Sequence, residues 1–266
     1  MTSGLVRPPA AAGTFYPADP SELRRLVDRL LETSAAVVGP RPWGIVVPHA
    51  GFVYSGPIAA TAYGALRPWA REIHRALLLG PAHFVPLEGC AVTAAEAWRT
   101  PLGEVAVDQG MRDAAVAAGC TVDEEPHRPE HSLEVQLPFL QRLVRAELRV
   151  LPIAVGRAAV TEVVAVLEAA EADLVVVSTD LSHYLDILAA RAADRRTADA
   201  VLARDAEVIG SRDACGVYAL RGAVAHARAT GRQIRLLDLR TSGDTAGDPD
   251  RVVGYGAFTI GEATTG

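Results

Sequence analysis

The sequence contains no lysine: all 26 of its cationic side chains are arginine. It therefore has no residue for Schiff-base catalysis, a pyridoxal-phosphate anchor or the lysine of a P-loop. It also lacks an uninterrupted apolar run of the ~18 residues that a membrane helix needs. Its first residues, MTSGLVRPPAAAGTFYP, have no basic head followed by an apolar core, so we expect no secretory signal. The three cysteines are odd in number and far apart, which argues against a disulfide framework and favours a reducing, cytoplasmic location.

The composition is rich in apolar residues, and charged residues are spread among them. Of 266 residues, 50% are hydrophobic and 22% charged, which excludes a disordered chain. The net charge of −6 argues against a nucleic-acid or anionic-membrane surface, because both need clustered positive charge. The length suits a single α/β domain, and there is no internal repeat or convincing linker, so we expect one domain over residues 1–266.

Short runs rich in Val, Leu and Ile alternate with helical patterns. Runs of this kind without polar alternation are typical of strands buried on both faces. We expect strands at 43–48, 76–80, 148–155, 173–178, 233–241 and 251–260. We expect helices at 21–32 with Ser21 as N-cap, 59–66, 109–118, 134–145, 160–170, 186–209 as one or two helices, and 212–230. The alternation predicts an α/β sandwich with a parallel or mixed sheet covered by helices.

Polar side chains follow three of these strands. His49 follows the first strand, His83 the second, and Asp180 and His183 the fourth. Ligands of open α/β sheets bind just outside the carboxyl ends of the strands, so these side chains are expected to meet in one crevice. Purely structural roles are the alternatives to ligand binding: a turn residue for His49, an N-cap for Asp180 and a structural hydrogen bond for His183.

A second group lies near two predicted helix starts. His131 and Glu134 are three residues apart, a spacing that places side chains on one helical face, either as cap and solvated charge or as an acid/base pair or metal ligand. Cys215 lies just before Gly216, near a helix start, where thiolates are favoured, although it could instead be a buried thiol. Two histidines plus Cys215, Glu134 or Asp180 would make a facial metal site with open positions.

The other histidines and cysteines carry weaker signals. His74, His127 and His226 lack such context and are expected at the surface. Cys90 and Cys120 lie in apolar or turn settings and are expected to be buried as small hydrophobes. No HExxH, CxxC, GxSxG or P-loop pattern is present, so a metal or acid/base site is the main chemical prediction.

Seven segments, taken in order, resemble the Memo family, whose prokaryotic members include the AmmeMemoRadiSam system protein B group. They are AGTFYP, VPHAGFVYSGPIAATAY, LLLGPAHFVPLEGCAV, EHSLEVQLPFLQ, VVVSTDLSHY, RDACGVYAL and SGD…VVGYGAF. The resemblance covers nearly the whole chain, residues 8–260. It implies a fold similar to class III extradiol dioxygenases: a three-layer α/β sandwich with a central mixed sheet between helices.

The resemblance also implies a metal site. Class III extradiol dioxygenases hold Fe(II) with two histidines and a glutamate, and Memo proteins look like relatives with a cysteine in the third place. Carried over, the metal ligands are His49, His83 and Cys215. The acid/base or supporting groups expected in the same pocket are His131, Glu134, Asp180 and His183. Phe84 stands where some Memo sequences carry a second histidine, a departure that alters the pocket.

The expected function is that of a metal-dependent oxidoreductase that uses O₂ and Fe(II) or copper on a small-molecule or peptide substrate. Zinc would instead fit metal-assisted hydrolysis, with Glu134 or His183 as base. A different class of function is a non-catalytic adaptor that captures a peptide or small ligand in the same pocket. The resemblance further implies AMMECR-type and radical SAM partner proteins, and no nucleic acid or membrane partner is expected.

Overall fold

The computed structural model describes residues 4–34, 39–144 and 147–262. Its strands are β1 (Val6–Arg7), β2 (Pro42–Val47), β3 (Arg75–Pro81), β4 (Cys90–Val92), β5 (Ala97–Thr100), β6 (Gly103–Val107), β7 (Thr121–Val122), β8 (Arg149–Val155), β9 (Leu174–Ser178), β10 (His183–Leu185), β11 (Gln233–Thr241) and β12 (Val252–Gly261). Its helices are α1 (Pro20–Thr33), α2 (Phe52–Ala65), α3 (Gln109–Ala117), α4 (Leu137–Leu143), α5 (Val160–Ala169), α6 (Ile187–Ala203) and α7 (Val217–Ala229), with 3₁₀ turns η1 (Arg67–Trp69), η2 (Glu134–Gln136) and η3 (Ser242–Asp244).

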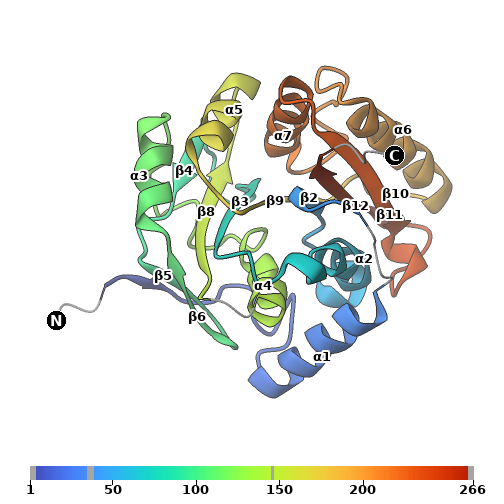
Figure 1. Cartoon of the computed structure of the whole chain (residues 1–266). Helices are drawn as coiled ribbons and strands as arrows, with labels where there is room; N and C mark the ends of the chain where they lie inside the picture. Colours follow the sequence, from blue (N-terminus) through green and yellow to red (C-terminus); the bar gives the residue numbers. More distant parts are fainter. Residues whose placement is uncertain (1–3, 35–38, 145–146, 263–266) are drawn as a thin grey trace.

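The strands form one mixed sheet with helices on both sides. Helices α1, α2 and α4 lie on one side of the sheet, and α3, α5, α6 and α7 on the other (Figure 1). The described residues place twelve strands in this sheet. The predicted α/β sandwich with a central mixed sheet is therefore confirmed.

The centre of the sheet is parallel. Its order is β6-β8-β3-β9-β2, and each neighbouring pair along this series is parallel. The last strand, β12, pairs antiparallel with β2, β11 and β10. Because β3, β9 and β2 lie side by side and run in the same direction, their carboxyl ends meet at one edge. His83, Asp180 and His49 follow these three ends.

The apolar runs form strands because helices cover both of their faces. Every residue of β9 is buried, and the last six residues of β3 are buried as well. Each of the six predicted strands is present, with ends within one residue of the prediction. The six strands that the sequence does not reveal, β1, β4, β5, β6, β7 and β10, are at most five residues long and too short to show a period.

Three helix starts differ from the prediction. Asp19, and not Ser21, caps α1: its carboxylate accepts the N–H groups of Ser21 and Glu22. Helix α2 begins at Phe52 and runs through Pro57, so the Gly and Pro of this segment, which resemble turn signals, lie at its N-cap and in its interior. Helix α7 begins at Val217, because the residues before it form turns.

Two helix ends also differ. Helix α6 ends at Ala203 because Arg204 adopts a left-handed φ of 56°, and its N–H bonds back to the last turn. The predicted helix over 134–145 begins as the 3₁₀ turn η2 and continues as α4 to Leu143. Arg145 lies outside the described residues.

Two histidines expected at the surface are buried. His127 is fully buried, and its Nε2–H donates to the carbonyl of Ala91 at 3.1 Å. His226 stacks on Trp43 with ring centroids 4.7 Å apart. Both predictions are wrong because the folded chain buries the two rings against Ala91 and Trp43, which lie far from them in the sequence. His74 is exposed and both Cys90 and Cys120 are buried, as predicted.

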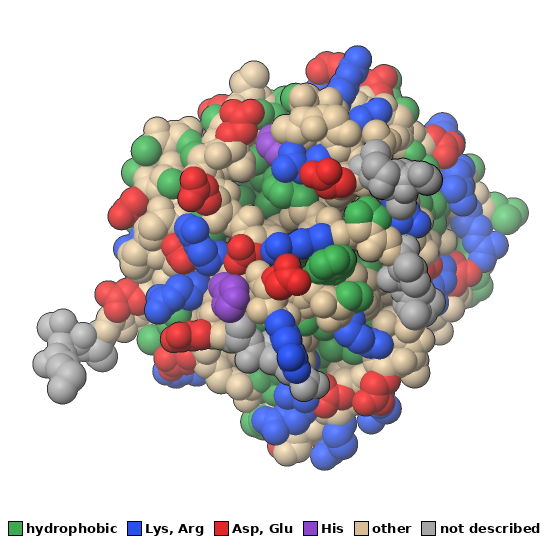
Figure 2. Space-filling view, in the orientation of Figure 1, with side chains coloured by type: hydrophobic (Ala, Val, Ile, Leu, Met, Phe, Trp, Pro, Cys, Tyr) green, Lys and Arg blue, Asp and Glu red, His purple; other side chains and the backbone are tan. Residues whose placement is uncertain are grey.

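The surface mixes charges of both signs. On the face shown in Figure 2, arginine and acidic side chains lie among each other, with small hydrophobic areas between them. Within the described ranges, no helix combines the length and the apolar character that crossing a bilayer requires.

Candidate metal centre

Three imidazoles meet at the carboxyl edge of the parallel strands. His49 follows β2, His83 follows β3, and His131 lies three residues before η2. A ring nitrogen of each lies within 4.8 Å of the other two. Their ring centroids are 5.1 Å apart for His49 and His83, and 4.8 Å apart for His83 and His131. The group is close enough for all three to face one metal ion.

The thiol of Cys215 touches this histidine group. Its Sγ lies 3.2 Å from Nε2 of His49 and accepts the backbone N–H of Asp180 at 3.2 Å. Gly216, the N-cap of α7, permits this approach, because a Cβ there would come within 2.7 Å of the carbonyl oxygen of Ser178. Burial, and then the charge of Asp180, raises the pKa of the Cys215 thiol. A bound cation would oppose both effects and hold the thiolate.

His49 is held in one orientation and one tautomer. Its backbone N–H donates to Asp180 Oδ1 at 2.8 Å, and its Nδ1 lies 2.9 Å from the hydroxyl of Ser178. That hydroxyl donates its own proton to the carbonyl of Ser132 at 2.6 Å. Its oxygen is therefore the acceptor for Nδ1–H of His49. The lone pair of His49 is thereby placed on Nε2, the atom that faces Cys215.

Glu130 holds the other two imidazole-bearing residues, and it is not among the site residues predicted from the sequence. One carboxylate oxygen accepts the backbone N–H of His83 at 2.6 Å. The other lies 2.9 Å from Nδ1 of His83 and accepts the N–H groups of His131 and Ser132 at 2.9 and 2.8 Å. A carboxylate on Nδ1 leaves Nε2 of His83 available to a metal. The only signal in the sequence is an acid directly before His131.

The carboxyl of Glu130 stays ionised in this setting. Burial alone would raise its pKa, but the hydrogen bonds from the ring and backbone of His83 and from Ser132 outweigh burial and lower the pKa to about 2. The fully buried carboxylate is thus a fixed negative charge behind two of the imidazoles. Such a charge raises the basicity of a metal-ligating histidine.

His131 carries an unsatisfied polar atom. Its Nδ1 is buried and has no hydrogen-bond partner, although a carboxylate oxygen of Glu130 lies 3.3 Å away. Its ring stacks on Phe15 at 4.1 Å and meets the edge of Phe84, which is 58% exposed, at 5.8 Å. Buried polar atoms normally have partners, so an orphan within a cluster of donors fits a bound cation. Imidazoles beside a thiol are ligands for iron, copper or zinc.

Burial sets the protonation of the cluster. It lowers the pKa of His49 to about 3, with the charge of His83 as the next cause, and it lowers the pKa of His131 to about 4, followed by the charge of His49. Both rings are therefore neutral near pH 7. Neutral imidazole is the form that binds metal.

We expect the metal-free protein to lose stability as the pH falls from 6.5 towards about 4. In the unfolded chain these imidazoles take up protons near pH 6.5, whereas folded His49 and His131 stay neutral down to about 3 and about 4. The unfolded state then binds more protons, so the free energy of unfolding rises with pH in this window. Urea unfolding at several pH values measures it. His49→Gln should flatten the dependence; an unchanged slope in that variant contradicts the assignment.

Asp180 and His183 lie beside the cluster in different settings. Asp180 is buried and supports the backbone of His49, and burial raises its pKa. His183 is exposed, and its Nδ1 lies 2.8 Å from the carbonyl of Leu181. The structure thus places a supporting carboxyl beside the backbone of His49 and a solvent-facing imidazole at the start of β10.

Glu134 lies apart from the imidazoles. Its fully buried carboxylate pairs with Arg7 at 2.6 Å, accepts the N–H groups of Ala10 and Ala11 at 2.7 and 2.9 Å, and accepts the hydroxyl of Tyr16. Among the described residues it makes no hydrogen bond to an imidazole of the cluster. The structure therefore gives Glu134 an anchoring position for the N-terminal segment.

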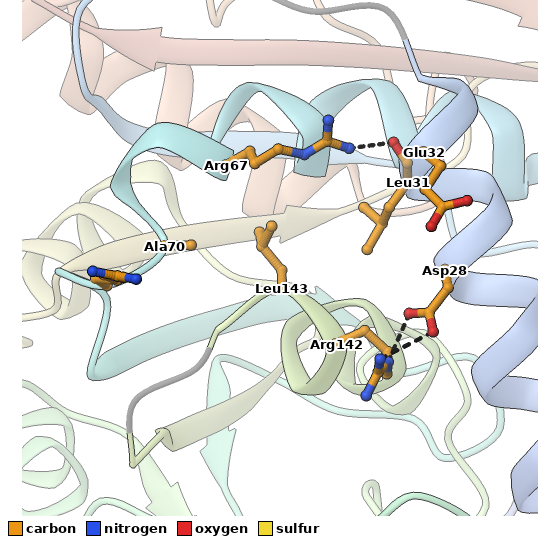
Figure 3. A pocket seen from close by; sticks show the side chains of 8 residues that line it. Asp28, Leu31, Glu32, Arg67, Ala70, Arg142 and Leu143 are labelled. Atoms are coloured by element: carbon orange, nitrogen blue, oxygen red, sulfur yellow. Dashed lines mark hydrogen bonds and ion pairs between the residues drawn. The ribbon is translucent and has the colours of Figure 1, made fainter.

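A separate hollow lies between α1, α4 and η1 (Figure 3). Arg142 binds Asp28 through two hydrogen bonds of 2.7 and 3.0 Å, and Arg67 donates to the carbonyl of Leu31. The residues that line it include no histidine or cysteine. This hollow is distinct from the histidine cluster.

The fold and the site together define an α/β sandwich protein with a candidate metal centre at the carboxyl edge of its parallel strands. The chain belongs to the Memo family: the family model described as Memo-like protein matches residues 7–259. It is 37% identical to a MEMO1 family protein of Aquifex aeolicus, over 94% of this chain and 97% of that protein. It is 35% identical to one of Methanopyrus kandleri, over 96% and 99%, and 34% identical to one of Methanococcoides burtonii, over 96% and 100%.

Proposed function

We propose that this protein is a metal-dependent oxidoreductase that uses Fe(II) or copper and O₂. The observation that carries the proposal is the contact of Cys215 Sγ with Nε2 of His49, at 3.2 Å, beside two further imidazoles. A thiolate among imidazoles favours softer, redox-active metals over magnesium or calcium. His49, His83 and Cys215 would hold the ion, and His131 is close enough to take part.

The bound ion would supply the electron transfer, and the side chains around it would prepare the site. Glu130 fixes the ring of His83 through Nδ1, and Ser178 fixes the tautomer of His49. His131, with its unpaired Nδ1, and His183, which faces solvent, are placed to accept or return a proton. Phe84 offers an exposed apolar edge against which a small-molecule or peptide substrate could pack.

The decisive experiment is metal analysis of protein purified without oxygen. We expect about one iron or copper per wild-type chain, and loss of that metal in His83→Ala and Cys215→Ser. His74→Ala is the matched control, because His74 is exposed and outside the cluster. Wild-type protein that holds no metal and refuses added Fe(II) and copper would overturn the proposal in favour of a non-catalytic adaptor. Stoichiometric zinc without oxygen consumption would favour hydrolysis instead.

The same proposal includes the cellular compartment and the partner proteins of this activity. A reducing cytoplasm would keep the Cys215 thiol available as a ligand. AMMECR-type and radical SAM proteins are its proposed partners, and co-purification of tagged protein from its native host tests them. Oxygen uptake by the metal-loaded protein with small phenols and short peptides tests the substrate class.

A further inference from the structure

Two cysteines that lie outside the metal centre stand opposite each other near the end of the sheet. Cys90 is the first residue of β4, and Cys120 directly precedes β7. These strands pair in parallel, with Ala91 opposite Thr121. One residue earlier on each strand, the same register sets Cys90 opposite Cys120. The hydroxyl of Thr121, 3.4 Å from the carbonyl of Cys90, shows that the strands are still close there.

This placement suits a disulfide bond. Paired strands lie roughly 4.8 Å apart, and disulfide-bonded residues have Cα atoms roughly 4.4–6.8 Å apart. Residues at equivalent positions of paired strands direct their side chains to the same face of the sheet. Each cysteine is buried, with 5% of its surface exposed. Both are free thiols, so the strand register places two reduced cysteines side by side in the interior.

The two sulfurs are not equivalent. The neighbouring thiol of Cys90 lowers the pKa of Cys120, against the opposing effects of burial and the charge of Glu162. The neighbouring thiol of Cys120, together with burial, raises the pKa of Cys90. Thiolates are the nucleophiles of thiol chemistry, so Cys120 is the sulfur that reacts first and Cys90 the one that resolves the product.

We propose that Cys90 and Cys120 are a reversible redox pair, which hydrogen peroxide converts into a disulfide between β4 and β7. The sulfur of Cys120 attacks one peroxide oxygen, the O–O bond breaks, and a sulfenic acid and one water form. The sulfur of Cys90 then attacks that of Cys120, so that the S–S bond forms, the S–O bond breaks and a second water leaves. Two electrons pass from the two thiols to peroxide, and a dithiol reductant restores them.

The pair lies at the base of two segments that build the histidine cluster. The loop before β4 carries His83, and the segment after β7 carries Glu130 and His131. His127, in that second segment, also bonds the carbonyl of Ala91 next to Cys90. A bond between Cys90 and Cys120 would therefore tie together the two segments that supply these side chains.

The test is peptide mapping of the full-length protein after treatment with hydrogen peroxide at neutral pH. Remaining thiols are blocked under denaturing conditions, and trypsin, which in this lysine-free chain cuts only after arginine, puts the cysteines on separate peptides, 76–99, 113–142 and 213–221. We expect peptides 76–99 and 113–142 to be joined, two of the three thiols to be lost, and dithiothreitol to restore both. Cys215→Ser should leave the joined pair intact, which separates this result from any failure of the proposed metal site.

Cys90→Ser and Cys120→Ser should each abolish the joined peptides. The proposal is overturned if Cys90 and Cys120 both remain open to alkylation after peroxide has oxidised Cys215. It is equally overturned if peroxide joins either cysteine to Cys215, or converts Cys120 to higher oxides without a disulfide.

Discussion

Glu134→Ala is expected to lower the free energy of unfolding by about 3–5 kcal/mol, because it leaves a buried guanidinium without its counter-charge. The side chain of Arg7 is 1% exposed and lies over the ring of Trp98 at 4.1 Å, so water cannot replace the lost carboxylate. The N–H groups of Ala10 and Ala11 lose their acceptor as well. The substitution therefore removes one acceptor group and leaves several buried donors without a hydrogen-bond partner.

Equilibrium unfolding in urea, followed by tryptophan fluorescence, measures this effect. Glu104→Ala is the matched control: Glu104 also pairs with an arginine, at 2.7 Å, but both side chains are about half exposed. Exposed pairs contribute about 0–1 kcal/mol, so this control should change stability little. Equal losses of unfolding free energy in the two variants would contradict the prediction, because the buried Arg7–Glu134 pair would then contribute no more to stability than an exposed pair.

Glu130→Gln is expected to weaken the affinity for iron or copper about 10–100-fold, the usual effect of losing a residue that orients a metal ligand. The amide has the size of the carboxylate but only one acceptor oxygen. Its NH₂ group must then face donors from His83 or from His131 and Ser132, so at least one imidazole loses its orientation. The fixed negative charge behind the rings disappears at the same time.

Competition with a metal chelator measures this affinity, after circular dichroism has shown that the variant is folded. Glu125→Gln is the control, because Glu125 lies in the same segment but is 67% exposed and pairs with Arg128. We expect the control to bind metal like the wild type. Wild-type affinity in Glu130→Gln would mean that the carboxylate does not organise the site.

Much of the fold can be predicted because its central strands contain apolar runs without polar alternation. The strand β9 can be predicted from its own residues, because a run of Leu and Val without polar alternation is typical of a strand buried between two layers of helices. Short strands at the periphery depend on their neighbours instead. Thr121 and Val122 form β7 only because β4 lies beside them, and no pattern in two residues can reveal that.

The same division holds for the site. His49 and His83 could be placed because each follows a predictable strand, and parallel strands bring their carboxyl ends together. Glu130 could not, since its partner His83 lies on a loop 47 residues away and its own segment is polar. The anchoring of Glu134 by Arg7 spans 127 residues, and its position at a helix start suggests surface capping instead.

The position of β12 has a consequence for how the chain reaches this structure. Phe258 of β12 pairs with Val46 of β2, so a strand made early in synthesis stays open at one edge until residues made much later arrive. Contacts between such distant residues form slowly, and an open apolar strand edge can pair with other chains in the meantime. Yield of native protein during expression should therefore depend on temperature and chain concentration, and peptides that mimic 252–261 should act as folding inhibitors by occupying β2 first.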